Sequence, residues 1–150
     1  MSYSNGEMLI LAALRSISGG VWTVSNSRVG KWSLLNTGKA DHYAILKPGA
    51  FIHTFQAASS SLTEWRTVIE VWQRYKDDGS SLISLEGLSA SIIQKFDQEN
   101  RLDDTTETVQ DSFCSGGSEV TEQWTKGGGP AWLKQEIFID WKEEANVTFG

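Results

Sequence analysis

The segment AWLKQEIFIDW (131–141) constrains the fold more than any other stretch of the chain, because its polar and apolar residues alternate. From residue 131 to 142, the odd positions read Ala, Leu, Gln, Ile, Ile, Trp and the even positions read Trp, Lys, Glu, Phe, Asp, Lys. A period of two is typical of a β-strand that buries one face. The segment TEWRTVIEVWQRY (63–75) alternates similarly, with Trp65, Ile69, Val71 and Tyr75 on one side. The two segments predict long strands of a half-buried sheet.

Two other segments predict helices. The sequence SNGE (4–7) is typical of a capping box with Ser4 as the N-cap, and the apolar run MLILAAL (8–14) follows it. A helix that is apolar all round is buried in a core or against a partner. After DDGSS (77–81), with Ser80 or Ser81 as the N-cap, apolar residues recur at helical spacing. They are Leu82, Leu85, Leu88, Ile92, Ile93 and Phe96.

The rest of the chain predicts shorter strands separated by turns and loops. Early strands are expected at 21–24, 31–38 and 42–51, with NTG (36–38) and KPG (47–49) as turns and a polar loop over 56–62. An antiparallel set at 108–114, 118–125 and 131–141 closes the chain. Residues 1–150 are thus predicted to form a single α+β domain. It is a mainly antiparallel β-sheet packed against two helices, in the order helix, strands, helix, strands.

Composition excludes several classes of protein. The formal net charge of −6 argues against a nucleic-acid-binding surface, which needs clustered Lys and Arg to neutralise phosphates. Cys114 is the only cysteine, so the chain forms no internal disulfide, and a reducing cytosol fits best. The apolar run at 8–14 is too short to span a bilayer and lacks the basic flank of a signal peptide. We expect a protein made in the cytoplasm, with no membrane association.

The stretch WTKGGGPAW (124–132) invites comparison with a phosphate-binding loop. Such a loop runs from a strand into a helix and ends in Gly-Lys-Ser/Thr. Here Lys126 precedes the glycines, Pro130 removes an N–H donor, and a strand follows. A hairpin loop fits better. Because three glycines cost backbone entropy, we expect assembly to order this loop around Lys126, Gly128 and Pro130.

The residues that could support catalysis are few. His42 and His53 are the only histidines, and neither belongs to a metal-binding pair. Asp41 and His42 are neighbours on a strand, so they point to opposite faces. A small hydrolase that gathers these residues with a carboxylate stays a remote alternative. We expect no enzyme activity, no cofactor and no metal site.

Three large aromatic residues fall on the polar faces of the predicted strands: Trp72, Trp132 and Phe138. Either a helix packs over both sides of the sheet, or these residues are exposed for a protein partner, since Trp and Phe are enriched in interface cores. In the second case, Trp72→Asp or Trp132→Asp would block assembly and leave a folded monomer. Trp72, Trp132 and Phe138, with Lys126, Gly128 and Pro130, are the candidate subunit-interface residues.

From Lys31 to Lys142 the sequence resembles the tail terminator, or tail completion, proteins from the neck of long-tailed bacteriophages. The resemblance rests on WSLLNTGKADHYAILKPGAF, on VWQRYKDDG at the end of a long strand, on the helix SLISLEGLSASIIQKF, and on GGGPAWLKQEIFIDW. The order of elements and the glycine-rich hairpin before the last strand are shared features.

The resemblance implies a structural virion protein and not an enzyme. It implies a homo-oligomeric ring, usually a hexamer, that caps the tail tube and joins it to the head connector, with DNA passing through without specific binding. An acidic lumen would suit that passage. The segments 47–51, 56–62 and 126–131 are then candidates for contacts between subunits or for the lumen. Two alternatives stay open: a connector or stopper protein of the neck, and a carbohydrate- or peptide-binding module that uses exposed tryptophans.

Overall fold

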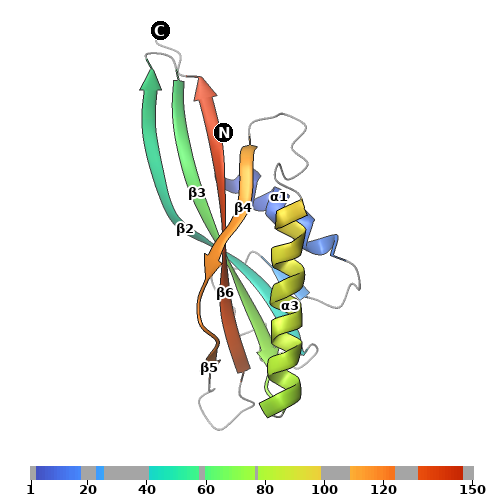
Figure 1. Cartoon of the computed structure of the whole chain (residues 1–150). Helices are drawn as coiled ribbons and strands as arrows, with labels where there is room; N and C mark the ends of the chain where they lie inside the picture. Colours follow the sequence, from blue (N-terminus) through green and yellow to red (C-terminus); the bar gives the residue numbers. More distant parts are fainter. Residues whose placement is uncertain are drawn as a thin grey trace.

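The computed structural model describes residues 3–17, 23–25, 41–57, 60–76, 78–98, 109–123 and 132–146. These residues form the predicted α+β fold in the predicted order of helix, strands, helix, strands (Figure 1). The helices are α1 (Tyr3–Arg15) and α3 (Asp78–Gln98). The strands are β1 (Thr23–Ser25), β2 (His42–Ala57), β3 (Ser60–Arg74), β4 (Val109–Gly117), β5 (Thr121–Gln123) and β6 (Trp132–Asn146).

The described strands form one sheet in the order β1-β2-β3-β6-β4, with β5 also paired to β6. Strand β3 pairs antiparallel with β6 along its whole length, from Ser60 opposite Asn146 to Arg74 opposite Trp132. Strand β2 continues the sheet antiparallel to β3, and the short β1 is parallel to the start of β2. Strands β4 and β5 pair with different parts of β6, so they lie one after the other along the same edge of β6. The long β3–β6 pair is therefore the middle of the sheet.

One face of the sheet, which we call the helix face, carries the main core. Helices α1 and α3 lie on the same side of the sheet, and their apolar residues join those of the odd positions of β3 and β6 in one cluster. The alternation predicted from sequence is therefore confirmed for both strands. The buried members of this cluster are Ile10, Ala13, Leu14, Ala44, Leu46, Ile69, Val71, Leu85, Ile92, Phe96, Leu133, Ile137, Ile139 and Trp141.

Both helices begin earlier than the sequence predicted. Helix α1 starts at Tyr3 and α3 at Asp78, so Ser4, Ser80 and Ser81 lie inside the helices and are not N-caps. The Ser81 hydroxyl instead accepts a hydrogen bond from the Lys76 backbone N–H at 2.8 Å. Only one side of each helix meets the sheet. Met8 is therefore 64% exposed although α1 is apolar all round, and Leu82 and Ile93 of α3 are also exposed.

Strand β2 runs straight through the KPG segment that was expected to be a turn. Pro48 lies opposite Thr67 and Phe51 opposite Trp65, so β2 carries one residue more than β3 between these pairs. This β-bulge reverses the alternation of β2, and Phe51 points to the helix face although Lys47 points to the other. A Cβ on Gly49 would lie 2.9 Å from Cγ of Arg66, so the bulge needs glycine there.

The polar loop expected at 56–62 is also largely strand. Strand β2 continues to Ala57 and β3 begins at Ser60, with Ala57 paired to Ser60. Small polar residues therefore extend the two strands instead of separating them. The NTG turn, the strand expected at 31–38 and the glycine-rich loop with Lys126, Gly128 and Pro130 lie outside the described residues.

The expectation that Trp72 and Trp132 are exposed is wrong. Both lie on the face of the sheet opposite the helices, as predicted, but each is only 1% exposed within the single chain. They form a second cluster with Tyr43 and Ile45, and the ring centroids of Tyr43 and Trp132 are 5.7 Å apart. The alternative explanation, a helix packed over both sides of the sheet, is not what buries them, because the described helices α1 and α3 both lie on the helix face. We call the side of the sheet that carries Trp72 and Trp132 the second face.

Cations lie over the aromatic rings of the second face. The Arg74 guanidinium is 4.6 Å from the centroid of Trp132, and the Lys134 ammonium is 5.5 Å from that of Trp72. Phe138 is half-buried, with the Arg66 guanidinium 4.9 Å from its centroid. Stacked cations of this kind stabilise aromatic rings within a charged surface by about 0.5–1 kcal/mol each at exposed sites.

Replacing Trp132 by alanine tests whether this residue belongs to the core. Because the side chain is fully buried, Trp132→Ala should lower the free energy of unfolding by about 3–5 kcal/mol, measured by urea denaturation. Phe113→Ala, at a residue that is 44% exposed, is the control and should cost about 1 kcal/mol or less. Equal losses in the two variants would show that Trp132 is not a core residue. Trp132→Asp should unfold the protein and not yield a folded monomer.

Candidate interaction site

Two features of the sheet stand outside its apolar clusters: a network of charges on the second face, and an exposed end that projects past the helices. The network begins with Glu70 of β3 and Glu136 of β6, which lie directly opposite each other in the strand register. Like charges opposite each other destabilise a sheet. Glu70 is only 1% exposed, so water does not screen its charge. The pair requires nearby cations.

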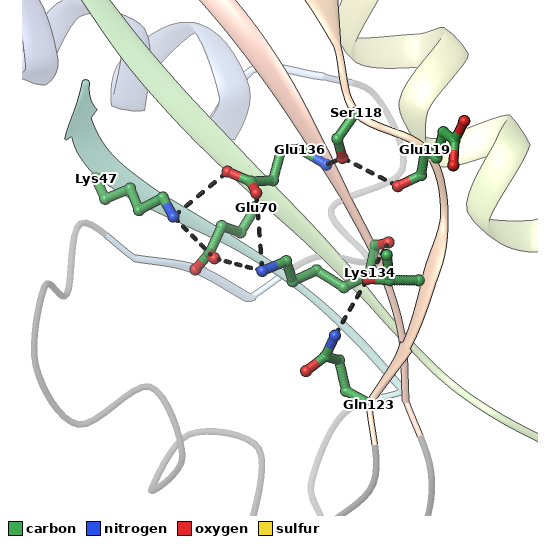
Figure 2. Close-up of polar contacts among 8 residues, drawn as sticks. Lys47, Glu70, Ser118, Glu119, Gln123, Lys134 and Glu136 are labelled. Atoms are coloured by element: carbon green, nitrogen blue, oxygen red, sulfur yellow. Dashed lines mark hydrogen bonds and ion pairs between the residues drawn. The ribbon is translucent and has the colours of Figure 1, made fainter. Parts of the chain in front are cut away.

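Lys47 of β2 and Lys134 of β6 supply those cations, as Figure 2 shows. The Lys47 ammonium is 3.3 Å from a carboxylate oxygen of Glu70 and 3.3 Å from one of Glu136. The Lys134 ammonium is 3.2 Å from Glu70 and 3.8 Å from Glu136. Each lysine thus bridges both carboxylates, and the four charges sum to zero. The network joins three adjacent strands.

The pKa of Lys47 reports this arrangement. Partial burial of the ammonium alone would lower the pKa, but attraction to Glu70 and Glu136 and hydrogen bonds to both carboxylates outweigh it. The net result is a pKa raised above the ordinary value of 10.5. Lys47 therefore stays protonated to a higher pH in the folded protein than a free lysine does in water.

Hydrogen bonds from the segment between β4 and β5 fix the backbone at Glu136. The Ser118 hydroxyl accepts from the Glu136 N–H at 2.9 Å, and the Ser118 N–H donates to the Glu136 carbonyl at 2.8 Å. The Gln135 side chain donates to the Ser118 carbonyl at 3.1 Å and accepts from the Ser89 hydroxyl of α3 at 2.7 Å. A Cβ on Gly117 would lie 2.5 Å from the Glu136 carbonyl oxygen, so this approach requires glycine. The backbone that carries Glu136 is thus held by contacts with α3 and with the segment between β4 and β5.

Cross-strand ion pairs continue along the second face towards the far end of β3 and β6. Arg66 binds Asp140, its register partner, through two hydrogen bonds of 2.8 and 3.2 Å. This contact raises the pKa of Arg66 above its ordinary value, chiefly through the hydrogen bond to the carboxylate. Glu64 and Lys142 form the next pair at 3.8 Å and are more exposed. In these two pairs the charges of β3 and β6 match each other.

The projecting end of the sheet, which we call the arm, consists of residues 50–57 of β2, 60–66 of β3 and 140–146 of β6. Figure 1 shows these strand ends extending beyond α1 and α3. Phe51, Ile52 and Phe55 of the arm are 60%, 63% and 56% exposed. Phe51 and Phe55 point to the helix face and Ile52 to the second face, so both sides of the arm present apolar surface.

A groove of about 250 Å³ crosses the arm at its base. Residues from β2, β3, β6 and β4 line it: Ala50, Phe51, Ile52, Glu64, Trp65, Arg66, Phe113, Asp140, Trp141 and Lys142. By strand register, Ile52, Arg66, Asp140 and Phe113 share the second face there. Exposed Ile52 and Phe113 stand at either side of a floor of paired charges. Such a groove suits a neutral, partly apolar occupant.

The structure thus changes which residues are candidates for an interface. Trp72 and Trp132 are internal, and Phe138 is half-buried beside Arg66. Among the exposed apolar residues of β2, Phe51 lies in the candidate segment 47–51, but Ile52 and Phe55 were missed. One signal could have identified them: no Asp, Glu, Lys or Arg occurs between Lys47 and Glu64. A strand-forming run of that length without charge is uncommon at an exposed position.

The residues considered for catalysis are not brought together. The Asp41 carboxylate binds the Lys76 ammonium at 2.7 Å, and that hydrogen bond lowers the pKa of Asp41. His53 on the arm lies 2.6 Å from the Thr63 hydroxyl. Burial raises the pKa of the Cys114 thiol. Among the described residues, no group of three His, Cys, Asp or Glu could hold a metal ion. None of the described helices is long and apolar enough to cross a membrane.

The ion network predicts unequal costs for two lysine substitutions on β6. Lys134→Met leaves one cation for two carboxylates, one of them buried, and should lower the free energy of unfolding by about 3 kcal/mol. Lys142→Met removes only an exposed pair and should cost less than about 1 kcal/mol. Chemical denaturation of both variants provides the comparison. A loss for Lys134→Met no larger than for Lys142→Met would contradict the buried network.

The raised pKa of Lys47 predicts a loss of stability in alkali. The folded pKa lies above the unfolded one, so the contribution of Lys47 is complete below about pH 10.5 and disappears as the pH rises through the folded pKa. The difference in free energy of unfolding between wild type and Lys47→Met should therefore be constant near neutrality and shrink above about pH 10.5. A difference that stays constant up to pH 12 would contradict this.

No protein-family model matches the chain, and no curated protein matches it. The likeness to tail terminator proteins thus rests on the segments quoted above. The geometry of the arm and of the ion network has to carry the functional argument.

Proposed function

We propose that the chain is a structural subunit that assembles through its arm, as a tail terminator ring at the neck of a long-tailed bacteriophage. The observation that carries this proposal is the cluster of exposed apolar side chains on both sides of the arm: Phe51, Ile52 and Phe55. Contiguous exposed apolar surface on a soluble protein marks an interaction site. The arm replaces Trp72 and Trp132 as the proposed contact surface.

Covering the arm gives a sizeable gain in free energy. Phe51 and Phe55 together expose on the order of 200 Å² of aromatic surface, so their burial contributes about 5 kcal/mol at ~25 cal/mol per Å². Association costs an estimated 4–15 kcal/mol before any net affinity appears. The two phenylalanines therefore supply the centre of an interface but not the whole of it. A ring subunit, which meets one neighbour on each side, provides the additional area.

The ion network suits a structural role. Matched charges tie β2, β3 and β6 into one rigid unit beneath the arm. A rigid base lets the arm meet a neighbour without a large loss of conformational entropy. The net charge of −6 suits a ring through which DNA passes without binding. Tail tube and head connector are the partners that this role entails, and a stopper or connector position in the same neck is the alternative.

A second candidate function follows from the groove. Its walls at Ile52 and Phe113 and its floor of paired charges are compatible with a peptide-binding module. Such a module would stay monomeric, and Phe113→Ala would weaken peptide binding. In the assembly proposal, Phe113→Ala has no effect on self-association.

Substitution at the tip of the arm tests the proposed function. Phe55→Asp should abolish self-association and the capping of purified tail tubes, because a charge replaces an apolar anchor, and should leave a folded monomer. Ile83→Asp is the matched control, since Ile83 is 70% exposed on α3, away from the arm. Native mass spectrometry and negative-stain imaging, with and without tail-tube protein, give the readout. If Phe55→Asp still caps tubes, the arm is not the assembly surface.

A further inference from the structure

We infer that two copies of the free chain pair through the outer edge of β2, antiparallel and centred on His53, to form a two-fold dimer. The inference rests on the proposed self-association and adds its geometry for the unassembled protein. It concerns the hydrogen-bonding edge of the arm as well as its apolar side chains.

Among the described strands, none pairs with the outer edge of β2 along the arm. Strand β1 pairs with β2 only from Tyr43 to Ile45, and no other strand in the described ranges pairs with that edge. All side chains from Ala50 to Phe55 are exposed. An open strand edge offers a row of N–H and C=O groups to any extended segment. The regular stretch from Ala50 to Phe55 spans about 20 Å at ~3.3 Å per residue, enough for a short strand pairing.

Between its two register shifts, the edge of β2 in the arm carries no protective residue. Natural edge strands carry lysine, proline or a bulge that discourages pairing. Pro48 and the bulge at Gly49 do this at the base of the arm, and a second register shift lies between Phe55 and Ala57, but AFIHTFQ (50–56) has no charged residue, proline or glycine. Such a segment has the composition of aggregation-prone strands. A soluble chain with this edge needs a specific occupant for it.

The sequence of the edge is complementary to itself. In an antiparallel pair centred on His53, Phe51 of each copy lies opposite Phe55 of the other, and Ile52 lies opposite Thr54. Phe51, His53 and Phe55 point to one side of the arm, so the two Phe pairs flank the histidines on the same side. Aromatic and β-branched pairs of this kind contribute to strand pairing. No other register centred within 50–56 pairs both phenylalanines with phenylalanine of the other copy.

The antiparallel two-fold arrangement also ends the assembly. It uses the same edge of both copies, so no β2 edge is left open. A parallel, in-register stack would leave a free edge at each end and would grow into a fibre. The hydrogen bond between His53 and Thr63 holds the central side chain against its own sheet. The dimer keeps the edge of β2 paired until a ring neighbour or the tail tube replaces the second copy.

A cysteine at the centre of the pairing tests the register. Residues directly opposite in an antiparallel pair have Cα atoms about 4.5–5.5 Å apart, within the range that a disulfide bridges. In a Cys114→Ser background, His53→Cys should cross-link under mild oxidation into a dimer. Ala50→Cys is the control, because two copies of residue 50 would lie about 20 Å apart along paired strands. We expect His53→Cys to cross-link at least about tenfold faster than Ala50→Cys, since only the former meets the distance requirement.

A charge on the edge gives an independent test. Ile52→Lys should turn the dimer into a monomer in sedimentation or native mass measurements, while Ile83→Lys on α3 should leave it a dimer. Circular dichroism of both variants confirms that they remain folded.

The outcomes separate this inference from the proposed function. A free protein that is dimeric or larger but shows equal cross-linking at positions 53 and 50 would overturn the β2 pairing and leave assembly through the arm standing. A monomeric wild type at about 100 μM, far above the Kd range of a stable interface, would also overturn the pairing. Whether that monomer still caps tail tubes then decides the proposed function on its own.

Discussion

The second face of the sheet depends on two carboxylates, Glu70 and Glu136, that the register of β3 and β6 places directly opposite each other. Shifting that register by one residue would move every side chain of β6 to the other face. The present register buries Ile137, Ile139 and Trp141 under the helices, at the cost of the juxtaposed charges. Lys47 and Lys134 make the arrangement tolerable, because each contacts both carboxylates. The apolar pattern thus sets the register, and the lysines neutralise its electrostatic consequence.

Alternation predicted the two faces of β3 and β6, because a period of two is a property of the strand itself. It could not predict what covers the second face. Trp72 and Trp132 stand among charged residues in both strands, and only the fold shows that Arg74 and Lys134 lie over their rings within an enclosed cluster. A charged neighbour in sequence is compatible with an exposed ring and equally with a buried ring capped by a cation.

The prediction of a turn at KPG (47–49) was wrong for a related reason. Proline and glycine favour turns when nothing else constrains the backbone. In β2 the pairing with β3 resumes at Phe51, and the extra residue is absorbed as a bulge. Proline is tolerated at an edge strand or a bulge because no ladder hydrogen bond is lost there. Strand pairing on both sides of the segment therefore outweighed the preference of proline and glycine for a turn. Because a turn was expected there, the apolar arm that follows was not predicted from the sequence.

The division of charge along the sheet connects these points to assembly. From Glu70 to Lys142, the charges on the described part of the second face are matched within the chain, so this surface gains little by attracting a charged partner. The arm carries no charge on β2 and exposes aromatic rings instead. A neutral, flat edge is recognised best by another neutral edge, because a charged partner would lose hydration without compensation. The bulge at Gly49 lies between the charged part of the sheet and the uncharged arm. Before the bulge, β2 contributes Lys47 to the ion network, and after it β2 exposes Phe51 and Phe55. One extra residue therefore turns a strand that stabilises the fold into a strand that exposes aromatic rings.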